Sequence, residues 1–143
     1  MRIVLTLMFL TVLAPVFGQQ SVSSHLYEGK IDGKLSITMY LRSYDNECTA
    51  ELTYEGMYKY NNTGQWMQLD IYRNDKDQFV LVENVFTGVM ILQKTNEGFS
   101  GVWISPDTKK QLKVELQKGK LTPKAIEIYE DKYDSVNYEN HDC

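Results

Sequence analysis

Residues 35–42 read Leu-Ser-Ile-Thr-Met-Tyr-Leu-Arg, and apolar side chains alternate with polar or amphipathic ones along the whole run. A period of two places the two sets on opposite faces of a β-strand. The same alternation recurs downstream, at 48–60, 66–72 and 112–117. Runs rich in Val, Ile, Leu, Phe and Trp occupy 79–83, 88–95 and 98–104, and an opening strand covers about 25–31. The sequence therefore predicts eight strands.

Short turn sequences separate these strands. Asp32-Gly33 and Asn61-Asn62-Thr63-Gly64 are typical of hairpin loops, and similar residues stand at 45–47, 74–77, 96–98 and 105–107. None of these connections has room for a crossover helix, so neighbouring strands should be antiparallel. Eight such strands can close into an all-β, up-and-down barrel without free edges. An open two-sheet sandwich is the alternative.

The two ends of the chain differ from this pattern. Met1-Arg2-Ile3 followed by an apolar run to Phe17 and then Gly18 is typical of a signal peptide at 1–18. A membrane anchor is the alternative, but the apolar run is shorter than the roughly 20 residues that a spanning helix needs. We expect a periplasmic or secreted protein without a membrane span once the leader is removed, with a flexible start at 19–24 and a barrel at 25–118.

The last segment, 119–143, contains Thr122-Pro123, which is a typical helix start. We expect a short helix lying on the barrel, with an extended tail as the alternative and a loose run from Asn137 onward. In an oxidising compartment Cys48, at the start of a predicted strand, and the terminal Cys143 are candidates for a disulfide. A free Cys143, or one that pairs between molecules, is the other interpretation.

Composition removes several classes of function. The formal net charge of −4 disfavours binding to nucleic acid. Apart from the leader, histidine occurs only as His25 and His141, near the two ends, so neither is expected in a site built on strands. Ser-His and Cys-His nucleophiles therefore lack a base, and the sequence shows no metal-ligand spacing. We expect a protein with no catalytic residues, no cofactor and no metal.

Two carboxylates leave a weaker enzymatic alternative. Glu83 follows the apolar run 79–82, and Asp70 stands in the strand 66–72. If both faced inward they would form an acid–base pair for hydrolysis. The plainer expectation is that each faces solvent or pairs with a cation on a neighbouring strand, and a buried pair between Glu83 and Arg42 is a third interpretation.

A set of short motifs resembles a known group. Gly56-Met57-Tyr58-Lys59-Tyr60, Phe79-Val80-Leu81-Val82-Glu83, Thr87-Gly88 and Phe99-Ser100-Gly101-Val102-Trp103 occur in this order, with Lys109-Lys110 before the last strand. Over about residues 26–118 the chain resembles small exported proteins, common in Bacteroidetes, that have no assigned activity. The meander is loosely similar to avidin-like and lipocalin barrels. This likeness implies a fold and carries no ligand residues.

Aromatic side chains are the remaining candidates for function. Rings in an eight-stranded barrel can stack on one small ligand and orient it through OH and NH groups. The plainer interpretation is that these rings simply fill the barrel. In strand 48–60 the phase of Tyr54, Tyr58 and Tyr60 is expected to face the core, and if Trp66 and Tyr72 face outward they form an exposed aromatic patch. The sequence thus predicts a module that binds a small apolar molecule or a glycan, with an envelope protein partner as the alternative. The candidate ligand-binding residues are Tyr54, Tyr58, Tyr60, Trp66, Tyr72, Glu83 and Trp103.

Overall fold

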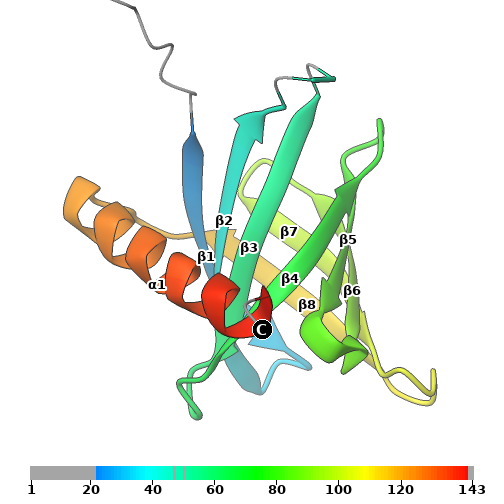
Figure 1. Cartoon of the computed structure of the whole chain (residues 1–143). Helices are drawn as coiled ribbons and strands as arrows, with labels where there is room; N and C mark the ends of the chain where they lie inside the picture. The colour runs from blue at the N-terminus through cyan, green and yellow to red at the C-terminus, as the bar shows by residue number, and fades with distance from the viewer. Residues whose placement is uncertain (1–21, 47, 50, 142–143) are drawn as a thin grey trace, which may run out of the picture.

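The computed structural model describes residues 22–46, 48–49 and 51–141 (Figure 1). Eight strands and one long helix make up this part of the chain. The strands are β1 Ser23–Ile31, β2 Leu35–Asp45, β3 Leu52–Tyr60, β4 Trp66–Arg73, β5 Gln78–Glu83, β6 Val89–Lys94, β7 Gly98–Ile104 and β8 Gln111–Lys118. A three-residue turn, η1 Asn84–Phe86, joins β5 to β6, and the helix is α1 Pro123–His141.

The strands form one closed barrel in which each pairs with its sequence neighbours. Every pair is antiparallel, and β1 pairs with β8 to close the sheet. The predicted up-and-down barrel with a C-terminal helix is therefore confirmed, and the sandwich is wrong. The short hairpin connections decide this outcome, because they force consecutive strands to lie side by side.

The inward-facing side chains fill the middle of the barrel. They alternate along each strand with outward-facing ones, as the period of two requires. The most completely buried of them are Tyr58, Phe79, Ile31, Ile37, Met39, Leu81, Met90, Leu92 and Val114. A barrel of eight strands has an interior that side chains can just fill, so ligand space is confined to its ends.

Helix α1 covers the outer face of β1 to β4 (Figure 1). Its Tyr133 and Val136 are buried against Tyr40 and Met57, which point out of the barrel. Its Glu130 faces the barrel, where its carboxylate accepts hydrogen bonds from Arg42 and from the Tyr40 hydroxyl. The helix thus adds a second, smaller core on one side of the barrel.

The helix also extends further than expected. The loose run predicted from Asn137 onward is wrong as far as His141, since α1 continues to that residue. The amide of Gln68 donates to Asn137 at 2.7 Å, and Asn140 donates to Gln68 at 3.1 Å. These side-chain hydrogen bonds tie the last turns of α1 to β4.

The β2–β3 connection differs from the prediction. Cys48 lies in a turn instead of opening a strand, and β3 starts at Leu52. The side chain of Asn46 accepts hydrogen bonds from the backbone amides of Cys48 and Thr49 at 2.9 and 3.3 Å. An asparagine that caps its own turn in this way takes the backbone out of the sheet ladder. Cys48 is exposed, and the predicted disulfide partner Cys143 lies outside the described residues.

At the start of the chain, β1 begins at Ser23 because Ser23 and Ser24 already pair with Ser43 and Arg42 of β2. The flexible start predicted for 19–24 is therefore wrong at residues 23 and 24. The predicted signal peptide at 1–18 lies outside the described residues. Among residues 22–46, 48–49 and 51–141, no helix combines the length and the apolar character that crossing a bilayer demands.

One seam in the barrel wall is incomplete. β3 and β4 pair only over Glu55–Lys59 and Trp66–Asp70. Beyond this ladder the two strands diverge toward the end where β2 stops (Figure 1). A groove of about 550 Å³ lies between residues 51–54 and 71–75. We call this end of the barrel the mouth and the end that holds η1 the base.

Candidate functional site

A cavity of about 290 Å³ opens at the mouth. We define the mouth pocket by the residues that line it: Ser23, His25, Tyr27, Leu41, Arg42, Ser43, Leu52, Tyr54, Phe79, Lys94 and Phe99. They belong to the first residues of odd-numbered strands and the last residues of even-numbered ones, which an up-and-down barrel brings to the same end. The pocket is at the small end of the range for ligand sites.

Four rings form the floor of the mouth pocket. Tyr27 meets Phe99 edge to face with ring centroids 4.8 Å apart, and Phe99 meets Phe79 in the same way at 5.1 Å. Tyr54 meets Phe79 at 5.1 Å. Such edge-to-face pairs are the preferred arrangement of aromatic rings. The floor is therefore a surface of mutually packed aromatic rings, below which side chains fill the barrel.

The rim of the mouth pocket carries positive charge. His25 stands on β1 and Lys94 at the end of β6, and both line the cavity. Burial lowers the pKa of His25, and the nearby charges of Lys118 and Lys94 lower it further. The expectation that neither histidine lies in a site built on strands is therefore wrong for His25. Its pairing with β2, opposite Leu41, holds it there.

Of the predicted ligand residues, only Tyr54 lines the mouth pocket. Tyr58, Glu83 and Trp103 meet instead at the base, in the interior. Glu83 is 3% exposed. Its carboxylate accepts hydrogen bonds from the Tyr58 hydroxyl, from Trp103 Nε1 at 2.6 Å and from Thr87 Oγ1 at 2.6 Å. We call these four residues the base cluster; the hydroxyl of the half-buried Tyr60 lies 3.5 Å from that of Tyr58.

The base cluster corrects two expectations about Glu83. It neither faces solvent nor pairs with Arg42, which donates to Glu55 at 2.8 Å and to Glu130 instead. Nor does it form an acid–base pair with Asp70, because Asp70 faces outward and is exposed, as the plainer expectation had it. Burial and the hydrogen bond to Glu83 raise the pKa of Tyr58 far above its usual range, so this hydroxyl stays protonated and serves as a donor.

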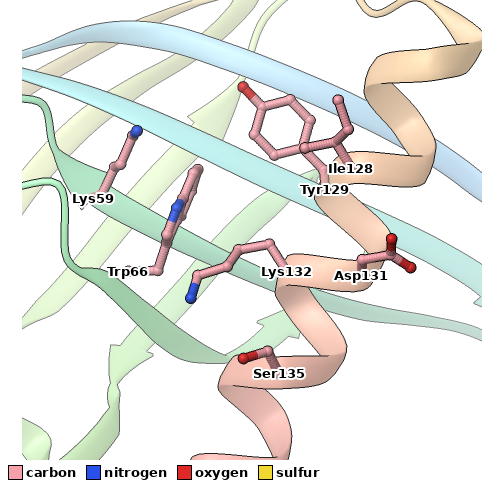
Figure 2. Close-up of a pocket in the computed structure, with 7 residues that line it drawn as sticks. All are labelled: Lys59, Trp66, Ile128, Tyr129, Asp131, Lys132 and Ser135. Carbon is pink, nitrogen blue, oxygen red and sulfur yellow. The ribbon is translucent and has the colours of Figure 1, made fainter.

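The two outward aromatic residues do not form one patch. Trp66 is half-buried beside α1, with its ring centroid 5.8 Å from that of Tyr129. It lines a cleft of about 570 Å³ between α1 and the β3–β4 hairpin. Figure 2 shows Lys59, Lys132 and Tyr129 gathered around the indole, and the Lys59 ammonium lies 4.9 Å from the ring centroid. The exposed patch predicted from Trp66 and Tyr72 is thus wrong, because α1 covers Trp66.

Tyr72 does remain at the surface, 68% exposed. It pairs across the strands with Val80, which pairs with Ile91, which in turn pairs with Val102. All four point outward on the wall that α1 leaves uncovered. This outward row of apolar side chains is the observation that favours the alternative of a protein partner.

The chain matches no protein-family model, no curated protein and no solved structure. The function therefore has to be argued from the geometry of these sites. Within the described ranges, no group of three or more His, Cys, Asp and Glu side chains is arranged to hold a metal ion.

Sequence reasoning missed the other members of the mouth pocket, among them His25, Tyr27, Phe79, Lys94 and Phe99. The signal was present, because each has the inward parity of its strand and each lies at the strand end nearest the mouth. Combining parity with strand direction, instead of counting aromatic residues, would have found them.

Proposed function

We propose that this protein is an exported, non-catalytic binding module that holds one small molecule with an apolar body in the mouth pocket. The observation that carries the proposal is the concave aromatic floor at the mouth. Flat rings in a shallow, partly enclosed pocket bind apolar or ring-shaped ligands through dispersion and burial of apolar surface. Export rests on the sequence of residues 1–18 alone.

The arrangement of the carboxylates supports a role without catalysis. Glu83 commits its oxygens to three donors from the protein, and Asp70 points away from it. A hydrolase of the kind considered above needs one acid and one base on either side of a substrate. The base cluster instead has the form of a structural anchor, in which every partner is already satisfied.

A protein partner is supported less directly. The row of Tyr72, Val80, Ile91 and Val102 stands on the outer wall of the barrel, whereas the mouth pocket is a cavity lined by rings from several strands. Concave pockets are the usual form of small-molecule sites. We therefore place ligand binding first.

Thermal unfolding with a panel of small apolar and sugar ligands tests the proposal, because a ligand that binds only the folded protein raises its unfolding temperature. Ser43 lines the pocket, so Ser43→Phe should fill the space and abolish the stabilisation. Ser100→Phe is the matched control, since Ser100 points away from the interior on β7, between Phe99 and Gly101. The proposal fails if no ligand stabilises the wild-type protein, or if Ser43→Phe responds as the control does.

A further inference from the structure

The rim of the mouth pocket gathers cations that lack carboxylate partners. Lys94 ends β6, and Lys118 ends β8 directly opposite Tyr27 of β1. Both lysines are exposed. In the part of the chain that the structure describes, neither ammonium forms an ion pair. In a protein of net negative charge, Lys94 lines the mouth pocket and Lys118 stands beside it, opposite the lining residue Tyr27.

The two arginines near the mouth, unlike these lysines, already form ion pairs with carboxylates. Arg73 donates to Asp77 at 2.7 Å, and Arg42 is held by Glu55 and Glu130 on the outer side of the barrel. His25 lies close enough to both lysines for their charges to act on it. Lys94 and Lys118 are therefore the cations close to the pocket that act on His25, which lines the pocket together with Lys94.

We propose that the ligand of the mouth pocket is an organic anion, whose carboxylate lies at Lys94 and Lys118 and whose apolar or aromatic body lies on Tyr27, Phe79 and Phe99. This proposal rests on the proposed function and narrows it to one chemical class. A bare inorganic anion would leave the rings exposed to water, whereas a neutral apolar molecule would leave the cations unused. An amphipathic acid satisfies both halves of the pocket.

Pairs of ligands that share an apolar body and differ only in charge separate the contribution of the lysines from that of the aromatic floor. 2-Naphthoate and 2-naphthamide share one body and differ in charge, and decanoate and decanamide provide a second such pair. We expect each carboxylate to bind about tenfold tighter than its amide by isothermal titration calorimetry at low salt, which is about 1.4 kcal/mol. The preference should shrink at high salt, because the lysines are exposed and ions screen them.

Substitutions test whether the preference for the carboxylate comes from Lys94 and Lys118. The double variant Lys94→Met, Lys118→Met removes both charges at exposed positions, where the fold is insensitive. It should bind the acid and the amide equally well. Lys113→Met is the control: Lys113 is exposed on the outer wall, 2.8 Å from Glu115, and its loss should leave the preference unchanged.

The outcomes distinguish the two proposals. A carboxylate preference that is lost only in the double variant supports the organic anion. If the amides bind as tightly as the acids, the pocket still binds small molecules but the inference about charge is wrong. If the preference survives in the double variant, the charge acts elsewhere and the inference is also wrong. If no probe of either pair binds, the proposed function itself is contradicted.

Discussion

Replacement of Glu83 by alanine tests whether the base cluster anchors the barrel. Glu83 is 3% exposed and accepts from Tyr58, Trp103 and Thr87. In Glu83→Ala these donors lose their acceptor. A buried donor without a partner costs about 1–3 kcal/mol. Thr87 is exposed and can turn to water, so the cost falls on the Tyr58 hydroxyl, in a fully buried residue, and on the half-buried Trp103 indole.

The Tyr58 and Trp103 donors together predict a loss of about 2–6 kcal/mol in the free energy of unfolding. At about 4 °C per kcal/mol for a domain of this size, the unfolding midpoint should fall by about 8–24 °C. Glu83→Gln keeps one acceptor oxygen and the shape of the side chain, so it should lose less. The control is Glu115→Ala: this side chain is 64% exposed in its pair with Lys113, and the pair contributes less than about 1 kcal/mol.

Tryptophan fluorescence gives a local readout for the same variant. The protein has two tryptophans, and in a Trp66→Phe background the signal comes from Trp103 alone. Its emission should shift to longer wavelength in Glu83→Ala, because the indole NH turns to water. If the midpoint of Glu83→Ala stays within about 2 °C of the wild type and the emission does not move, the carboxylate is not the anchor described above.

Three further predictions concern other parts of the molecule. A double-mutant cycle of Arg42→Met and Glu130→Gln, measured by urea unfolding, should give a coupling energy of about 1–2 kcal/mol; additive effects would mean that this pair does not hold α1 to the barrel. Gly88→Ala should destabilise the protein and shift the Trp103 emission, because a Cβ there would clash with the Trp103 indole; wild-type stability and spectrum would contradict the close packing. The pKa of His25 is lower in the folded protein than its usual 6.5, so the unfolded chain binds the proton more readily and stability should decline as the pH falls below about 6.5. His25→Gln should remove that part of the decline in unfolding midpoints between pH 7 and 5, and identical pH profiles for the two proteins would refute the assignment.

The barrel was predictable because its information is local. Alternation in 35–42 and at the other strands identifies an inward face, and the short turns after each strand fix the antiparallel order. The inward phase of Tyr54, Tyr58 and Tyr60 is confirmed for the same reason. The start of β3 was missed because one side chain, Asn46, ends the ladder through hydrogen bonds that periodicity does not encode.

The partners of Glu83 were not predictable. Tyr58 stands 25 residues before Glu83 and Trp103 stands 20 residues after it. Sequence alternation says that each faces inward, but the height at which each sits in the barrel depends on the register of several ladders. Because glutamates usually lie at the surface, the sequence analysis expected Glu83 to face solvent. Its inward position in the strand pattern was correct, but its burial was missed.

The burial of Met57 and Trp66 was missed for a different reason. Both have the outward parity of their strands, which in most barrels means contact with water. Here the tyrosines of α1 cover them. Where a helix of this amphipathic kind docks depends on tertiary contacts such as the one between Arg42 and Glu130, and no strand pattern reveals that position.

The short ladder between β3 and β4 leaves one side of the barrel entrance without hydrogen bonds between neighbouring strands. The ladder between these strands stops at Glu55 and Asp70, so widening the entrance on this side would break no hydrogen bond between β3 and β4. A ligand longer than the mouth pocket could therefore extend into the groove between residues 51–54 and 71–75 instead of out into solvent. If the pocket binds an organic anion as proposed, the acids should bind with similar affinity over a range of tail lengths, while the carboxylate stays required.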